Sequence, residues 1–161
     1  MGVVYSAVHS VDGLLYALTI VDTQGGPEHD ELRYLWYQGT DCFVLCYSIA
    51  DPSSLERVRS KWHPERVLHA SGTPAVLVGL QLDRRFGHHE SRSEFHHRFT
   101  DNDERVPVSR AEGEALAEAI AAVALVESSA QLSKHVSDVF DAAVRSAAVP
   151  PGRNRRKCTI S

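Results

Sequence analysis

The 161-residue sequence has no long apolar run and only three cysteines. No stretch approaches the roughly 18 consecutive apolar residues of a membrane-spanning helix, and the N-terminus lacks the basic start and apolar stretch of a secretory signal. Cys42 and Cys46 are four apart on one expected strand, which would hold them about 13 Å apart, too far for a disulfide. We therefore expect a reducing compartment, in which both thiols are small buried apolar groups.

Acidic residues are absent after Asp141. Four of the 17 Lys and Arg residues lie in the tail, so the rest of the chain carries 13 basic against 21 acidic residues, a net charge of -8. An acidic folded part argues against nucleic-acid binding, which needs a basic footprint on the folded domain. The basic tail suits an anionic lipid surface instead, through Arg153, Arg155, Arg156 and Lys157.

Apolar runs separated by turn residues predict strands that alternate with helices. Residues 3–11 and 14–21 flank Asp12-Gly13 and predict an antiparallel hairpin, whose second strand is apolar on both faces and should be covered on both. Further strands are expected at 42–48, 75–79 and 123–127. Helices are expected at 29–37, after Asp51 with an interruption at Pro64, from the capping box at Ser109 to about 122, and at 133–147.

This alternation indicates a doubly wound α/β sheet, mostly parallel with one antiparallel edge hairpin. Ligands of such sheets lie beyond the carboxyl ends of the strands. We expect one domain over residues 1–149, with a polar insertion at 86–105 that is too long for a plain loop, followed by a flexible basic tail at 150–161. The helix at 29–37 has too much apolar surface for a free loop, so it packs on the next helix or meets a partner through Leu32, Tyr34, Leu35 and Trp36.

Four strand-end segments carry a resemblance to a known family. Residues 22–27 read Asp-Thr-Gln-Gly-Gly-Pro, 61–65 read Lys-Trp-His-Pro-Glu, 78–83 read Val-Gly-Leu-Gln-Leu-Asp, and 127–131 read Glu-Ser-Ser-Ala-Gln. In order and spacing they resemble the Asp-Thr-Ala-Gly-Gln-Glu, Lys-Trp-x-Pro-Glu, guanine-reading and last nucleotide loops of Rho-family small GTPases, in the Ras superfamily. The resemblance covers the chain from about Tyr5 to Ser161.

The resemblance implies a guanine-nucleotide site for GTP or GDP with Mg²⁺. Asp22 corresponds to the magnesium-linked aspartate, and Gly25 to the glycine whose amide meets the γ-phosphate. Asp83 would accept hydrogen bonds from guanine, with Ser129 beside it and the Ala130 amide facing the base.

Departures from the family pattern imply a degenerate site. No G-x-x-x-x-G-K-[ST] P-loop occurs in the 161 residues, and a full family member would have its first strand, P-loop and first helix ahead of Tyr5. Gly26 replaces the glutamine that orients the attacking water, and Leu80 and Gln81 replace the Asn or Thr and the Lys of the guanine loop.

The missing strand would lie between the strands at 14–21 and 42–48. Its loss is expected to open the centre of the sheet and to leave Leu18, Ile20, Phe43 and Leu45 uncovered. The chain on its own would then keep little of the usual stability margin.

The terminal residues Cys158-Thr159-Ile160-Ser161 fit the C-a-a-X pattern for a farnesyl group on Cys158, and the basic residues before it supply the second signal that stable anchoring needs. We therefore expect a prenylated, hydrolysis-deficient interaction protein of Rho-type signalling, with Rho-type effectors or regulators as partners. Its expected location is the cytoplasmic face of the plasma membrane or endomembranes, with a cytosolic pool. Two alternatives remain: an active GTP-hydrolysing switch whose N-terminus is missing from this sequence, or a gene fragment without function.

Overall fold

The computed structural model describes residues 2–86, 106–148 and 158–160. All of the predicted insertion except Phe86, and all four basic residues of the tail, lie outside the described residues. Within the described ranges, no helix has the length and apolar character needed to cross a membrane.

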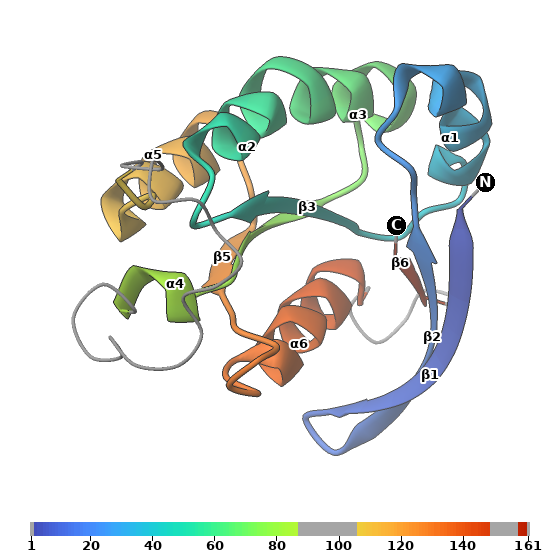
Figure 1. The fold of residues 1–161 in the computed structure, drawn as a ribbon. Coiled ribbons are helices and arrows are strands. Elements are labelled where there is room, and N and C mark those ends of the chain that lie inside the picture. The colour runs from blue at the N-terminus through green and yellow to red at the C-terminus, as the bar shows by residue number, and fades with distance from the viewer. Residues whose placement is uncertain (1, 87–105, 149–157, 161) are drawn as a thin grey trace.

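The elements form an α/β fold with two three-stranded sheets, ordered β1-β2-β6 and β3-β4-β5 (Figure 1). In chain order they are β1 (Val3–Val11), β2 (Leu14–Asp22), η1 (Pro27–His29), α1 (Asp30–Tyr37), β3 (Phe43–Ser48), α2 (Pro52–Arg57), η2 (Val58–Trp62), α3 (His63–Ala70), β4 (Ala75–Leu80), α4 (Asp83–Phe86), α5 (Arg110–Ala119), β5 (Ala124–Glu127), α6 (Val136–Ala147) and β6 (Cys158–Ile160). The second sheet is entirely parallel, while β1 and β2 form the predicted antiparallel hairpin. The predicted fold class is therefore confirmed.

Alternate side chains of the central strand β4 enter two separate cores. Ala75 and Leu77 pack in a core with α1, β3 and α5, whereas Val76 and Val78 pack in a second core with the hairpin and α6. Figure 1 shows the arrangement, with α1, α2 and α3 on one side of β3 and α6 on the other. Burial on both faces explains why β4 is a continuous apolar run.

Several turns follow local sequence signals, as predicted. Asp12 and Gly13 take φ angles of 52° and 78° at the tip of the hairpin, and the Asp51 side chain caps α2 by accepting from the Ser53 amide at 3.1 Å. Before Pro64 the helix widens into the π-helical turn η2, in which the His63 amide bonds to the Val58 carbonyl. Proline lacks an N–H and its ring crowds the carbonyl four residues earlier, so the predicted interruption is confirmed.

Two helix boundaries differ from the prediction. The last helix starts at Val136 rather than at residue 133, because Ser133 and His135 take left-handed φ angles of 50° and 57°. The helix that begins at Arg110 ends at Ala119 instead of near 122, and Ala121 has a φ of 51°. A left-handed residue cannot continue a right-handed helix.

The expected exposure of residues on β2 and β3 is wrong. Leu18, Phe43 and Leu45 are only 3%, 3% and 8% exposed, and Ile20 is half-buried. The hairpin packs against α6, which holds it through His9 and Asp141 (2.6 Å). The two halves therefore share a core, although β2 and β3 lie in different sheets.

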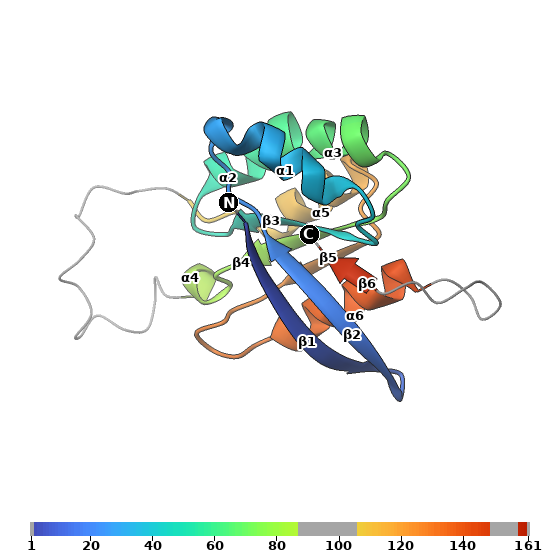
Figure 2. The same cartoon turned by 90° about the vertical axis from the view of Figure 1, so that its right-hand side faces the viewer.

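Two burial predictions are also wrong. Leu14 and Leu15 in β2 are 52% and 76% exposed, because the hairpin extends past the helices that cover its other end (Figure 2). Cys42 is fully buried as expected, but Cys46 is exposed on β3, the edge strand of the parallel sheet.

Candidate functional site: a guanine-nucleotide site and the loop after β2

Two of the predicted guanine-site residues meet where β4 and β5 end. The Ser129 hydroxyl donates to Asp83 Oδ1 at 2.5 Å. Backbone bonds join the two loops, from the Leu82 amide to the Ser128 carbonyl (3.0 Å) and from the Ser128 amide to the Gly79 carbonyl (2.8 Å). Ser129 itself is fully buried, so this end of the site is built by the fold rather than by a surface loop.

The turn around Ser129 is tight. Ser129 and Lys134 exchange two backbone hydrogen bonds, and the Ala130 carbonyl accepts from the Ser133 amide at 3.2 Å. The second oxygen of Asp83 lies 3.9 Å from Arg84 Nε. A carboxylate held in this way is an acceptor for the paired N–H groups of a guanine edge.

The two replacements in the guanine loop lie between these features. Gln81 takes a left-handed φ of 61° and accepts a hydrogen bond from the Ser48 hydroxyl at 2.5 Å, which links the carboxyl ends of β3 and β4. Leu80 is 40% exposed at the end of β4. An apolar side chain there offers no hydrogen bond to a nucleotide.

The loop after β2 carries the other predicted residues. Asp22 is exposed at the end of the strand. Gly25 packs on the indole of Trp62, to which a Cβ at this position would lie 3.4 Å away. A Cβ on Gly26 would collide with the Glu28 carboxylate, which therefore occupies the space where a glutamine side chain would begin.

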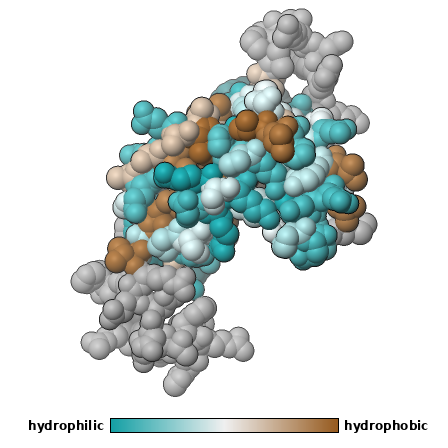
Figure 3. Space-filling view, turned by 90° about the horizontal axis from the view of Figure 1, so that it is seen from above, coloured by the Kyte–Doolittle hydropathy of each residue, from teal (hydrophilic) through white to brown (hydrophobic). Residues whose placement is uncertain are grey.

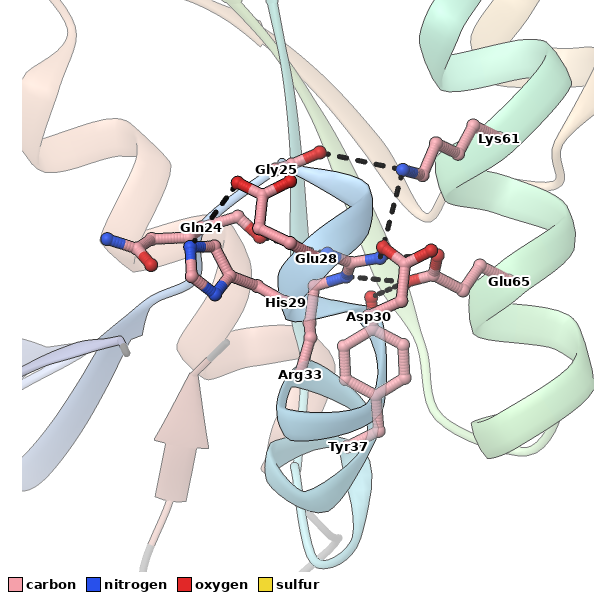
Figure 4. Close-up of polar contacts among 9 residues, drawn as sticks. All are labelled: Gln24, Gly25, Glu28, His29, Asp30, Arg33, Tyr37, Lys61 and Glu65. Atoms are coloured by element: carbon pink, nitrogen blue, oxygen red, sulfur yellow. Dashed lines mark hydrogen bonds and ion pairs between the residues drawn. The ribbon is translucent and has the colours of Figure 1, made fainter.

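Sequence reasoning missed the residue that organises this loop, Arg33 of α1. Its guanidinium binds both oxygens of Glu65 at 2.7 Å and Asp30 Oδ1 at 2.5 Å, and it donates to the Gln24 carbonyl at 2.9 Å (Figure 4). The Tyr37 hydroxyl donates to Glu65 Oε1 at 2.5 Å. We call Asp30, Arg33, Tyr37 and Glu65 the Arg33 network.

The Arg33 network is charged although it is buried. The side chains of Arg33 and Glu65 are 2% and 8% exposed, and the Trp62 ring centre lies 5.0 Å from the guanidinium. The bonds to Glu65 raise the pKa of Arg33. Burial alone would raise the pKa of Glu65, but the hydrogen bonds from Arg33 and Tyr37 outweigh it and hold that pKa below its ordinary value. The pair therefore stays ionised.

The loop after β2 is therefore bound to the helices by contacts within the protein. Gln24 is bound by α1, the Gly25 carbonyl lies 3.5 Å from Lys61 Nζ, and Glu65 belongs to α3. A signal was present in the sequence: Arg33 and Tyr37 are four apart on a helix, so they share one face, and Glu65 ends the tryptophan motif.

The predicted partner residues divide into two groups. Tyr34 stacks on His69 of α3, with ring centres 3.9 Å apart, so the packing alternative holds for this side chain. Leu32, Leu35 and Trp36 are 53%, 67% and 39% exposed on the outer side of α1. Figure 3 looks onto this helical side of the molecule, where apolar patches interrupt a mostly hydrophilic surface. We call Leu32, Leu35 and Trp36 the α1 patch.

The residues present fit one end of a guanine nucleotide and not the other. Asp83 and Ser129 provide the acceptor that a guanine base needs. At the loop after β2, Lys61 lies beside Asp30, Arg33 is bound by Glu65, and the carboxylate of Glu28 covers Gly26. Carboxylates and internally paired cations do not favour a phosphate chain.

A magnesium site receives no support from clustered ligands. In the ranges that the structure describes, no group of three or more His, Cys, Asp or Glu side chains is placed to hold a metal ion.

The comparison with known families agrees with the fold. A family model, described as the Ras family, matches residues 3–149, which is most of the chain. Members of this family are small GTP-binding proteins of signalling pathways, in which guanine nucleotide binds at the carboxyl ends of the strands, typically with Mg²⁺. The chain therefore belongs to the Ras family of small GTPases.

Proposed function

We propose that this chain is a Rho-type member of the Ras family that acts as a prenylated, hydrolysis-deficient interaction protein at the cytoplasmic face of the plasma membrane or endomembranes, with a cytosolic pool. The observation that carries the proposal is the Arg33 network. The network holds the loop after β2, and helix α1 with the α1 patch, through contacts within the protein. In a switch protein the corresponding loop depends on bound nucleotide for its conformation. A surface held in this way is suited to binding a partner without the help of a nucleotide.

The Rho-type assignment rests on the contacts that the tryptophan motif makes. Lys61, Trp62 and Glu65 all contact the loop after β2 or the side chain that holds it. The C-a-a-X terminus is the second support, because it adds a lipid signal to a basic tail.

Loss of hydrolysis follows from position 26. Hydrolysis in this class needs a side chain that orients the attacking water, and glycine has none. The Glu28 carboxylate lies over the same position, and its charge would repel a γ-phosphate. The vestigial site is then Asp22, Gly25, Asp83, Ser129 and Ala130, without catalytic residues.

The partners of this function are a membrane and a protein. The farnesylated Cys158, with Arg153, Arg155, Arg156 and Lys157, would bind anionic lipid. The α1 patch, with its exposed leucines and a half-buried tryptophan, would bind Rho-type effectors or regulators.

A second candidate is an active GTP-hydrolysing switch. The retained pair of Asp83 and Ser129 favours it, because a guanine acceptor serves no purpose in a protein that never meets the nucleotide. Single-turnover hydrolysis of GTP separates the two candidates. The proposal predicts no rate above that of the Asp83→Ala variant, which lacks the guanine acceptor, and hydrolysis by the unmodified chain that this variant lacks would establish the switch.

The membrane role is tested with the full chain fused behind a fluorescent protein. We expect the fusion to associate with membranes, Cys158→Ser to release it into the cytosol, and Cys46→Ser, which removes the exposed thiol on β3, to leave it in place. An unchanged distribution of Cys158→Ser would refute the anchor.

A further inference from the structure

Most of the predicted lipidation motif forms a β-strand in the structure. Residues Cys158–Ile160 form β6, which pairs in parallel with β2, with Cys158 opposite Leu18, Thr159 opposite Thr19 and Ile160 opposite Ile20. Figures 1 and 2 show β6 beside β2, close to α6. Three of the four residues of the C-a-a-X motif are thus backbone partners of the hairpin.

The edge of β2 that β6 covers faces away from β1. In the described ranges β2 pairs only with β1 and β6, and no ladder joins it to β3. Leu18 is buried in the core shared with α6, so this part of β2 is held against the body of the domain. Unpaired backbone groups at such an edge are costly, and an extended segment satisfies them.

We propose that β6 masks the C-a-a-X motif, so that pairing with β2 competes with prenylation of Cys158 and with membrane insertion of the tail. The inference rests on the proposed prenylation. The competition follows from the backbone, because a segment whose amides and carbonyls are paired in a sheet cannot lie extended in the active site of another protein.

The masked reaction is a thioether synthesis with an allylic prenyl diphosphate as co-reactant. The sulfur of Cys158 forms a bond to C1 of the prenyl chain while the bond from C1 to oxygen breaks. Diphosphate leaves with the electron pair, and the thiol proton passes to solvent. Cys158 must leave β2 before this step.

The pairing is short, which makes it reversible. Three residues of parallel ladder supply few hydrogen bonds, and parallel pairing is slightly weaker per residue than antiparallel pairing. The competent fraction of tails sets the apparent rate of modification, so a mask closed nine-tenths of the time slows it about tenfold.

The first test measures farnesylation in vitro, with farnesyl diphosphate and a farnesyltransferase, and compares the full chain with a peptide of residues 150–161. We expect a ratio of rates, chain over peptide, of about one tenth. Thr159→Pro and Ile160→Pro, each made in both chain and peptide, remove the N–H groups of two neighbouring residues, of which one faces β2, so one of the two variants should bring the ratio close to 1. Thr159→Val keeps the N–H and should retain the low ratio.

The outcomes separate the two proposals. A peptide that is not farnesylated refutes prenylation of Cys158. A modified peptide with a chain ratio near 1, or a low ratio that neither proline variant changes, refutes the mask.

The second test needs no transferase. Hydrogen exchange of the amides in residues 18–20 is compared between the full chain and a chain ending at Lys157, with Val76 and Val78 of β4, which pairs on both sides, as internal controls. The mask predicts about tenfold faster exchange in the shortened chain at the amides that face β6. Equal exchange in the two chains would overturn it, and protection that disappears on tenfold dilution would assign β6 to a second copy instead.

Discussion

Replacing Arg33 with alanine is expected to be among the most destabilising changes in the described part of the chain. The substitution removes two hydrogen bonds of 2.7 Å to Glu65 and leaves a carboxylate that is 8% exposed, with the Tyr37 hydroxyl as its one remaining partner among the described residues. Breaking a buried ion pair by removing one partner costs about 3 to 5 kcal/mol, because the remaining charge is buried without compensation.

That loss is large against the whole stability of a domain, which is about 5 to 15 kcal/mol. For a chain of this length, each kcal/mol lowers the melting temperature by roughly 2 to 4 °C, so we expect a decrease of roughly 6 to 20 °C. Circular dichroism melting and urea unfolding measure it. The matched control is Arg145→Ala, because Arg145 is exposed, its partner Asp12 is exposed at the hairpin tip, and its second partner Asp141 keeps the contact with His9; this variant should melt close to the unmodified chain.

A combined variant tests the cause. Arg33→Met with Glu65→Leu and Tyr37→Phe removes the charge, its partner and the hydroxyl together, and should recover most of the lost stability. If Arg33→Ala melts like Arg145→Ala, or if the triple variant is no better than the single one, the argument from an uncompensated buried charge is wrong.

Three further predictions follow from other contacts. Burial would raise the pKa values of Glu65 and Glu127, but hydrogen bonds from Arg33 and Tyr37 to Glu65, and from Arg85 to Glu127, hold both pKa values below the ordinary 4.5. Their contribution to stability is therefore complete above about pH 4.5 and is lost as the pH falls through the folded-state pKa. The melting temperature should drop in that pH range, and less steeply for Glu65→Gln. Ser109→Ala removes the capping box of α5 and should cost about 0.5 to 2 kcal/mol in urea unfolding, whereas Ser60→Ala on an exposed helical face should cost less. Leu35→Glu should leave the free energy of unfolding within about 0.5 kcal/mol, because Leu35 is 67% exposed, and should abolish binding of Rho-type effectors or regulators in a pull-down with purified partners.

Elements fixed by local chemistry were predictable from the sequence. Asp12-Gly13 has the torsional freedom that the hairpin tip needs, Asp51 and Ser109 provide side-chain oxygens for orphan amides, and Pro64 cannot continue an ordinary helix. The contact between Asp83 and Ser129 was predictable for another reason. Parallel strands bring their carboxyl ends to one edge, so the loops that carry Asp83 and Ser129 had to meet.

The remainder depends on contacts between distant parts of the chain. Arg33 and Glu65 are 32 residues apart, and their pairing requires α1 and α3 to lie side by side, which no periodicity reveals. The late start of α6 was hidden because Ser133 and His135 suit a helix by composition, while the bridge between Ser129 and Lys134 forces them into the left-handed region. The cover over Leu18 depends on how α6 meets the hairpin, a contact between residues that are far apart in the sequence.

Nucleotide affinity tests the account most directly, through titration of the 161-residue chain with a fluorescent GDP analogue in the presence of Mg²⁺. The guanine acceptor at Asp83 remains, but the loop after β2 presents Glu28 over Gly26 and cations already paired with Asp30 and Glu65. We expect a dissociation constant of about 1 mM or weaker, which corresponds to roughly -4 kcal/mol of binding free energy. Saturation at micromolar nucleotide that is lost when Mg²⁺ is chelated would contradict the account.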